Sequence, residues 1–245
     1  MNGLKRMGLV FFSGVMLSAC GMVGVQDAPE DLAENWSQYI TEGSEALGSY
    51  GSDTDIDLIV SMGPDMMTDE DHVFVTMHVI GDLEEGHMEQ DGYEMYFQGT
   101  DAYQLENGSW VHYPEEGPVD YPSWYPNIAD ALVEIESFIQ AEHSDGELKL
   151  SYEGNDREVW NAFQEEFALS IDGISPENIV IDLDASLDEE TFYLEGLTLD
   201  ILGEETEGET TLASVSIVIE VDYFDHDEVD LTEVEEEVKA GTGKE

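Results

Sequence analysis

The chain has 245 residues, of which 59 are Asp or Glu and only 6 are Lys or Arg, so its formal net charge at pH 7 is −53. A charge of this sign and size excludes nucleic acids and anionic membrane surfaces as direct partners, because their phosphates would be repelled. An intramolecular disulfide is excluded too, because the chain has a single cysteine.

The first twenty residues have the pattern of a secretory signal. Lys5 and Arg6 form a short basic region, an apolar run follows from Gly8 to Leu17, and small residues precede Cys20. About ten apolar residues span only ~15 Å as a helix, half of the ~30 Å hydrocarbon layer, which makes a poor transmembrane anchor. The segment Leu17-Ser18-Ala19-Cys20 resembles the lipobox of bacterial lipoproteins. The resemblance implies a lipid anchor of palmitate-like acyl chains on Cys20, at the extracytoplasmic face of the cell membrane.

The remaining chain carries no low-complexity linker that would divide it. We therefore predict a signal peptide over residues 1–19, a lipidated tether over 20–27, one domain over 28–232 and an acidic flexible tail over 233–245.

The domain is predicted to begin with a helix over 29–47, where apolar residues recur at helical spacing after an N-cap at Asp27. From Thr54 to Tyr113 the apolar period changes to two, which predicts five strands. The Asn107-Gly108 pair is the strongest hairpin signal in the chain, typical of a type I′ turn. Such short connections imply an antiparallel meander, since parallel strands need long crossovers.

A loop rich in Pro and aromatic residues follows over 113–126, and then a second predicted helix over 127–142. A short strand is expected over 147–153, and Asp156 is expected to cap a third helix that ends near Gly173. Alternating apolar residues predict three further strands over 179–187, 192–202 and 215–223.

No pattern of residues indicates catalysis, a metal or a cofactor. The segment from Gly173 to Glu177 lacks the second glycine of a nucleophile elbow. The six histidines lack the His-x-His or His-x-x-x-His spacing of zinc sites: they are His72, His78, His87, His112, His143 and His226. With 59 acids, neighbouring carboxylates are expected by chance. We predict a protein that is not an enzyme, with no catalytic residues, no metal ligands and no cofactor.

Two acidic stretches have patterns that could bind cations. The run from Asp182 to Asp188 resembles a calcium loop, but it has Leu187 where a sharp turn requires Gly and is better interpreted as a strand with a wet outer face. Asp53, Asp55 and Asp57 would share one face of a strand and could hold cations loosely, although a solvated acidic face is the simpler interpretation.

The composition also predicts the salt concentration at which the protein is stable. Leu, Ile, Val and Phe supply about a quarter of the chain, enough to bury a core, so the carboxylates must cover its surface. Their repulsion acts over a Debye length of ~10 Å at 0.1 M salt but only ~3 Å at 1 M. We predict a halophilic protein.

Aromatic and methionine side chains gather in the predicted meander and the loop after it. Neighbours on a strand point to opposite sides, so the sheet is apolar on parts of both faces, and one of them is either covered or left as a hydrophobic hollow. The candidate ligand-binding residues are Tyr93, Met95, Phe97, Tyr103, Trp110 and Trp124.

Several segments together resemble a known architecture. They are the lipobox, a helix ending in Glu45-Ala46-Leu47-Gly48-Ser49-Tyr50, the run Tyr93 to Tyr103, Asn107-Gly108-Ser109-Trp110-Val111, and Leu187 to Phe192. The chain resembles uncharacterised lipoproteins of Gram-positive and halophilic prokaryotes that share the LolA/LppX-like half-barrel. This resemblance implies an α+β fold, a curved antiparallel sheet covered by about three helices, with lipids or lipoproteins carried in its concave face.

Three functions follow as alternatives. The first is a membrane-anchored lipoprotein that binds an apolar or amphipathic, lipid-like ligand. The second is an envelope sensor or accessory protein that binds a protein partner and has no ligand cavity, and the third is a cation-binding acidic surface protein.

Overall fold

The computed structural model describes residues 29, 31–62, 71–81, 85–90, 92–114, 125–144, 146–167, 169–208 and 210–242. The predicted signal peptide, the tether, Asp27, Cys20 and Trp124 lie outside these residues, as does most of the Pro-rich loop.

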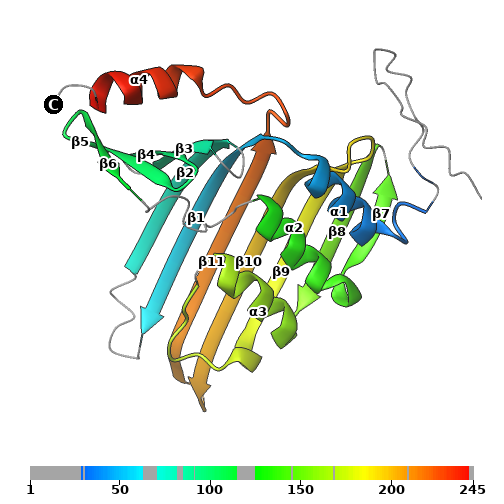
Figure 1. The fold of residues 1–245 in the computed structure, drawn as a ribbon. Helices are drawn as coiled ribbons and strands as arrows, with labels where there is room; N and C mark the ends of the chain where they lie inside the picture. The colour runs from blue at the N-terminus through cyan, green and yellow to red at the C-terminus, as the bar shows by residue number, and fades with distance from the viewer. Residues whose placement is uncertain are drawn as a thin grey trace, which may run out of the picture.

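The described chain forms one antiparallel sheet of eleven strands (Figure 1). The strands are β1 (Tyr50–Met62), β2 (Asp71–Gly81), β3 (Glu85–Gln90), β4 (Tyr93–Gln98), β5 (Asp101–Glu106), β6 (Ser109–Tyr113), β7 (Gln140–Ser144), β8 (Glu147–Gly154), β9 (Ile179–Asp188), β10 (Leu194–Glu207) and β11 (Thr210–Phe224). Their order is β6-β5-β4-β3-β2-β1-β11-β10-β9-β8-β7. One meander therefore runs outward from β1, and a second returns to the centre, where β11 pairs with β1.

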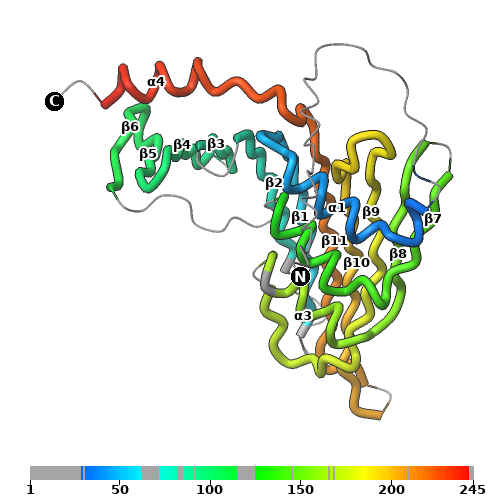
Figure 2. Tube along the Cα trace, turned by 45° about the vertical axis from the view of Figure 1, so that its right-hand side comes forward, coloured from blue at the N-terminus to red at the C-terminus, as the bar shows by residue number. Residues whose placement is uncertain are grey.

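Within the described residues, four α-helices accompany the sheet. They are α1 (Trp36–Ala46), α2 (Tyr125–Glu134), α3 (Arg157–Glu166) and α4 (Thr232–Thr242), and short 3-10 turns occupy Glu136–Phe138 and Pro176–Asn178. Helices α1, α2 and α3 lie over one face of β8–β11 (Figure 1). Strands β3–β6 bend away from the plane of these strands, and α4 runs along that bent part (Figure 2). We call the face under α1–α3 the concave face and the other the convex face.

The main core lies between β8–β11 and the three helices. Along β9, Ile181, Leu183 and Ala185 are buried while Asp182 and Asp184 are exposed, which is the two-residue alternation of a sheet with one wet face. The interpretation of residues 182–188 as a strand is therefore confirmed.

Two smaller clusters occupy the bent part of the sheet. The concave-face cluster contains Met77, Val79, Met88, Met95, Phe97 and Ala102. The convex-face cluster contains Tyr96 and Trp110 together with Val238 of α4. Tyr96 lies between Met95 and Phe97 on β4, so its side chain points to the opposite side of the sheet from theirs.

The predicted fold class is confirmed: the protein is α+β, with a large curved antiparallel sheet that does not close and has helices packed on its face. The Asn107-Gly108 turn is confirmed as well. Both residues have positive φ, 51° and 77°, and they connect β5 and β6 in register from Glu106 to Ser109.

Five predictions were wrong in extent or kind. The first meander has six strands rather than five, because β3 was missed. The first helix begins at Trp36 rather than 29, after turns over 31–35. The second ends at Glu134 rather than 142, and β7 occupies its predicted end, while the third ends at Glu166, well before Gly173. Residues predicted as a flexible tail form α4, which buries Val238.

Candidate functional site

Apolar side chains on β1 and β2 extend the concave face beyond the main core. Ile56, Leu58 and Val60 of β1 pack at the core edge and are only partly buried. Val75 lies opposite Ile56 and Val73 opposite Leu58, so both side chains of β2 join the same face. Val73 is 47% exposed. In Figure 1 these strands lie beside α2 and α3 rather than behind them. We call these five residues the concave apolar surface.

The concave apolar surface continues into the bent part of the sheet. Met77 and Val79 follow Val75 on the same side of β2, and Val79 lies opposite Met88 of β3. Met88 in turn lies opposite Met95 of β4. An apolar lining therefore runs across four strands. Its methionines are flexible and can adapt to irregular apolar shapes.

Five of the six predicted ligand residues are described, and they are divided between two faces of the sheet; Trp124 lies outside the described residues. Met95 and Phe97 are buried on the concave side, and Tyr93, 38% exposed, follows the same alternation. Tyr103 and Trp110 belong to the convex-face cluster under α4. The five described residues therefore do not share one face of the sheet. The five residues of the concave apolar surface were not among the predicted ligand residues, although their alternation predicts strands. The reason is that strand order decides which apolar face lies next to the helices.

Three buried tyrosines join the first residue of β1 to α2 and β11. The Tyr125 backbone N–H donates to the Tyr50 hydroxyl at 3.1 Å, and the Leu194 N–H donates to the Tyr125 hydroxyl at 2.6 Å. The ring of Tyr223 meets both tyrosine rings edge-on. Burial raises the pKa of Tyr50, Tyr125 and Tyr223 well above the ordinary value. These phenols stay protonated at neutral pH, so they act as packing and hydrogen-bonding groups rather than as bases.

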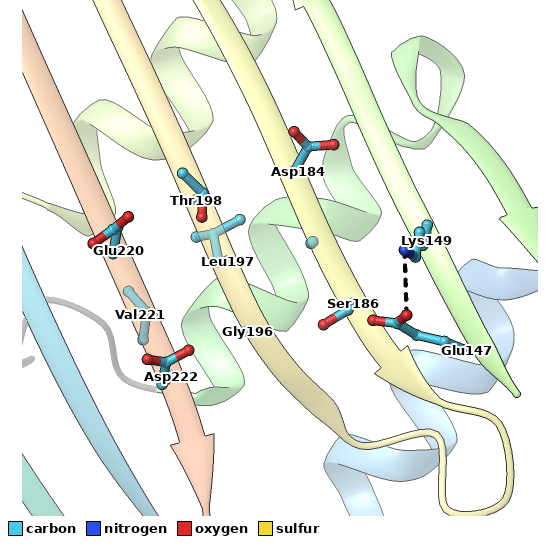
Figure 3. Close-up of a pocket in the computed structure, with 11 residues that line it drawn as sticks. Glu147, Lys149, Asp184, Ser186, Gly196, Leu197, Thr198, Glu220, Val221 and Asp222 are labelled. Carbon is cyan, nitrogen blue, oxygen red and sulfur yellow. Dashed lines mark ion pairs between the residues drawn. The ribbon is translucent and has the colours of Figure 1, made fainter. Parts of the chain in front are cut away.

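A polar hollow of about 410 Å³ lies on the other side of the sheet, over β8–β11 (Figure 3). Gly196 forms its floor, where a Cβ atom would lie 3.3 Å from the Val221 carbonyl oxygen. Lys149 and Glu147 pair at 3.4 Å at one side. The other charged lining residues are Asp184, Glu220 and Asp222. Its walls are acidic, so it does not suit an apolar ligand.

Among the described residues, one group places metal-ligating atoms together: His87, Glu89 and Glu94, all within 4.8 Å of one another. His87 and Glu89 share one side of β3, and Glu94 lies opposite Glu89 on β4. No spacing rule for histidine pairs would find this group, because it contains one histidine. The signal available in the sequence was the pattern His-x-Glu before a short turn with Glu after it.

Asp53, Asp55 and Asp57 line the convex side of β1, as predicted. Each contacts a side chain of β2: Asp53 Oδ1 lies 2.6 Å from His78 Nδ1, Asp55 Oδ1 accepts from the Thr76 hydroxyl at 2.8 Å, and Asp57 Oδ1 lies 2.5 Å from His72 Nε2. These carboxylates are therefore engaged in cross-strand pairs.

Within the described part of the chain, the helices are all too short or too polar to span a bilayer.

Comparison with known proteins gives distant structural similarities. No protein family and no curated protein matches the sequence. LprF from Mycobacterium bovis superposes with a TM-score of 0.34 at 10% identity, over 78% of this chain and 93% of LprF. A DUF1329 family protein from Desulfovibrio piger gives a TM-score of 0.27 at 10% identity, over 85% of this chain and 98% of its own. Similarity this low assigns neither a family nor a function.

Proposed function

We propose that the protein is a membrane-anchored, extracytoplasmic lipoprotein, not an enzyme, that binds an apolar or amphipathic ligand on the concave apolar surface. The observation that carries this proposal is the exposure of Val73 beside the partly buried Ile56, Leu58 and Val60. In a chain with 59 carboxylates, this continuous apolar stretch on one side of the sheet is a surface that an acyl chain would favour.

The charge of the protein selects among apolar ligands. At −53, the chain repels fatty acids and anionic phospholipids at low salt. An uncharged amphipath with an acyl chain, such as a monoacylglycerol, avoids this repulsion and buries its chain against valine, leucine and methionine. We therefore take an uncharged acyl-chain amphipath as the ligand class.

The test uses neighbouring residues of β2 that point to opposite faces. Val73 lies on the concave face, and Phe74, 58% exposed, lies on the convex face opposite Asp57. A fluorescent monoacylglycerol is titrated into the protein in 2 M sodium chloride. Val73→Asn is expected to weaken binding by about tenfold, because an amide must be desolvated against the acyl chain, whereas Phe74→Asn leaves binding unchanged. Equal loss in both variants, or no uptake by the wild type, would overturn the proposal.

The anchor is tested separately at Cys20. Cells expressing the protein are fed labelled palmitate, which is expected to join the wild-type chain and not Cys20→Ser. The lipobox resemblance supports this expectation, and two acyl chains suffice for stable anchoring. Wild-type protein recovered without label would remove the membrane location while leaving the ligand proposal open to its own test.

The halophilic character is the remaining part of the proposal. Screening of 59 carboxylates predicts that the melting temperature rises between 0.1 M and 2 M sodium chloride. Circular dichroism at both salt concentrations measures it. An unchanged melting temperature would show that repulsion does not limit stability.

A further inference from the structure

The hairpin formed by β3 and β4 brings one histidine and two glutamates together on the convex face. Glu89 lies directly opposite Glu94, and His87 lies opposite Tyr96 in the next pair on the same side. The His87 Nε2 atom is 3.1 Å from Glu94 Oε1. One possible ligand atom from each of His87, Glu89 and Glu94 lies within 4.8 Å of the other two.

His87 differs from the other histidine–carboxylate pairs on this sheet. The side chains of His72, His78, His112 and His143 are 57%, 39%, 43% and 31% exposed. The side chain of His87 is only 6% exposed. His87 thus presents a buried imidazole to one carboxylate, with a second carboxylate beside it, whereas the other pairs present more exposed rings.

The two glutamates also require an explanation. Like charges directly opposite each other on neighbouring strands destabilise a sheet, and Glu89 and Glu94 occupy such a pair one position from the Gln90–Tyr93 end of the hairpin. A cation between them would remove the repulsion and would also be within reach of the His87 imidazole.

We propose that His87, Glu89 and Glu94 bind one divalent transition-metal ion, with Zn²⁺ as the representative. Imidazole nitrogen with carboxylate oxygen suits Zn²⁺ and its neighbours, whereas Ca²⁺ and Mg²⁺ take oxygen ligands. Two ligands bound at ~2.0–2.2 Å lie at most ~4.4 Å apart, so the present separations need only small side-chain shifts. Glu89 is exposed, so the open coordination positions face solvent. The site lies on the opposite side of the sheet from the concave apolar surface and does not depend on the proposed ligand.

The chain offers matched controls for each component of the site. Asp182 and Asp200 are another directly opposed carboxylate pair, flanked in register by Glu153 and Val218 rather than by histidine. His112 and Asp101 form a histidine–carboxylate pair at 3.0 Å. Asp182→Asn and His112→Gln therefore remove the same chemical groups from surfaces that are not expected to bind the ion.

The experiment is equilibrium dialysis of the full chain in 2 M sodium chloride against Zn²⁺, with Co²⁺ as a spectroscopic substitute. We expect one saturable site, and visible Co²⁺ absorption that indicates fewer than six ligands. Glu89→Gln and Glu94→Gln should each weaken Zn²⁺ binding by at least tenfold, while Asp182→Asn and His112→Gln change it less than twofold. His87→Asn should abolish the Co²⁺ absorption. If that variant does not fold, the two glutamate variants still test the proposal.

The proposal is overturned if the wild type shows no saturable site. It is also overturned if Glu89→Gln and Glu94→Gln bind Zn²⁺ as tightly as the two controls, because the ion would then be held by the acidic surface at large.

Discussion

Two groups of strands in the sheet bury apolar residues in different ways. In β8–β11 and their helices, nearly all buried side chains belong to one cluster on one face. In β2–β6, buried side chains are split between a concave cluster and a convex cluster that α4 covers. We call the first the helix-covered half and the second the bent half. Most of the folding free energy therefore resides in the helix-covered half, because its buried apolar side chains form one continuous cluster.

This division bears on where function is located. Regions with fewer buried apolar contacts open at lower free energy than the main core, and ligand-binding segments are drawn from them. The His87 group lies in the bent half, and the concave apolar surface lies where the two halves meet. The helix-covered half thus serves as the rigid support.

The largest expected effect compares two fully buried phenylalanines, Phe163 of α3 and Phe97 of β4. Phe163→Ala should reduce the free energy of unfolding by ~3–5 kcal/mol, the usual cost of removing a core aromatic residue. Phe97→Ala should cost less and should increase hydrogen exchange mainly in β3–β5. Denaturant unfolding and hydrogen exchange in 2 M salt measure both. Equal global costs would show that the halves unfold as one unit.

Trp110 tests how α4 is held. Its side chain lies in the convex-face cluster with Val238. Trp110→Ala removes a large apolar side chain from the cluster under α4. Its global cost is limited by the free energy with which α4 docks and should be smaller than that of Phe163→Ala. Amide protection should fall over α4 and stay unchanged over β9–β11. Loss of protection in β9–β11 would contradict independent docking.

Two helical glycines should differ in how much stability is lost when each is replaced by alanine. A Cβ on Gly43 of α1 would lie 2.5 Å from the Phe192 backbone oxygen, whereas one on Gly241 of α4 would meet the Trp110 side chain at 2.9 Å. Backbone cannot move aside easily, so Gly43→Ala should destabilise by ~1–3 kcal/mol. Gly241→Ala should be close to neutral, because a shift of Trp110 is offset by the ~1 kcal/mol helix preference of Ala. Thermal unfolding of both variants measures the difference, and similar melting temperatures would refute it.

The predictable part of the fold is the part that local patterns determine. The alternation from Ile179 to Leu187 identified β9. Asn107-Gly108 identified the turn between β5 and β6, because two consecutive positive φ angles favour those residues. Strand β7 was missed because Gln140–Ser144 contains no β-branched residue and follows a helical apolar pattern. Helix α4 was missed because Val234 and Val238 are its main apolar contacts, too few for a periodic signal.

The candidate sites were less predictable than the fold. The concave apolar surface depends on β1 pairing with both β2 and β11, which joins segments more than 150 residues apart. The His87 group depends on a register that sets Glu89 opposite Glu94. Local periodicity reveals neither of these strand pairings. The aromatic and methionine side chains were therefore predicted to form one site, although those that are described lie on two faces of the sheet.

The smallest expected effect concerns the segment that connects the halves. His226 lies between β11 and α4, with its Nε2 atom 3.2 Å from the Leu194 carbonyl oxygen. The neighbouring Asp227 accepts from the Gly48 N–H at 2.6 Å and from the Tyr193 hydroxyl at 2.7 Å, so this segment is tied to the helix-covered half. Burial lowers the pKa of His226, although the Leu194 carbonyl and nearby carboxylates oppose the shift.

Because the folded pKa of His226 lies below the unfolded value of ~6.5, the unfolded chain takes up this proton first. The contribution of His226 to stability is therefore present above that value and is lost as the pH falls through it. An NMR titration of the ring should give a midpoint below 6.5, and His226→Gln should reduce the loss of stability between pH 7 and 5. A midpoint at or above the unfolded value would mean that the ring is open to solvent and that the connecting segment is not held against the helix-covered half.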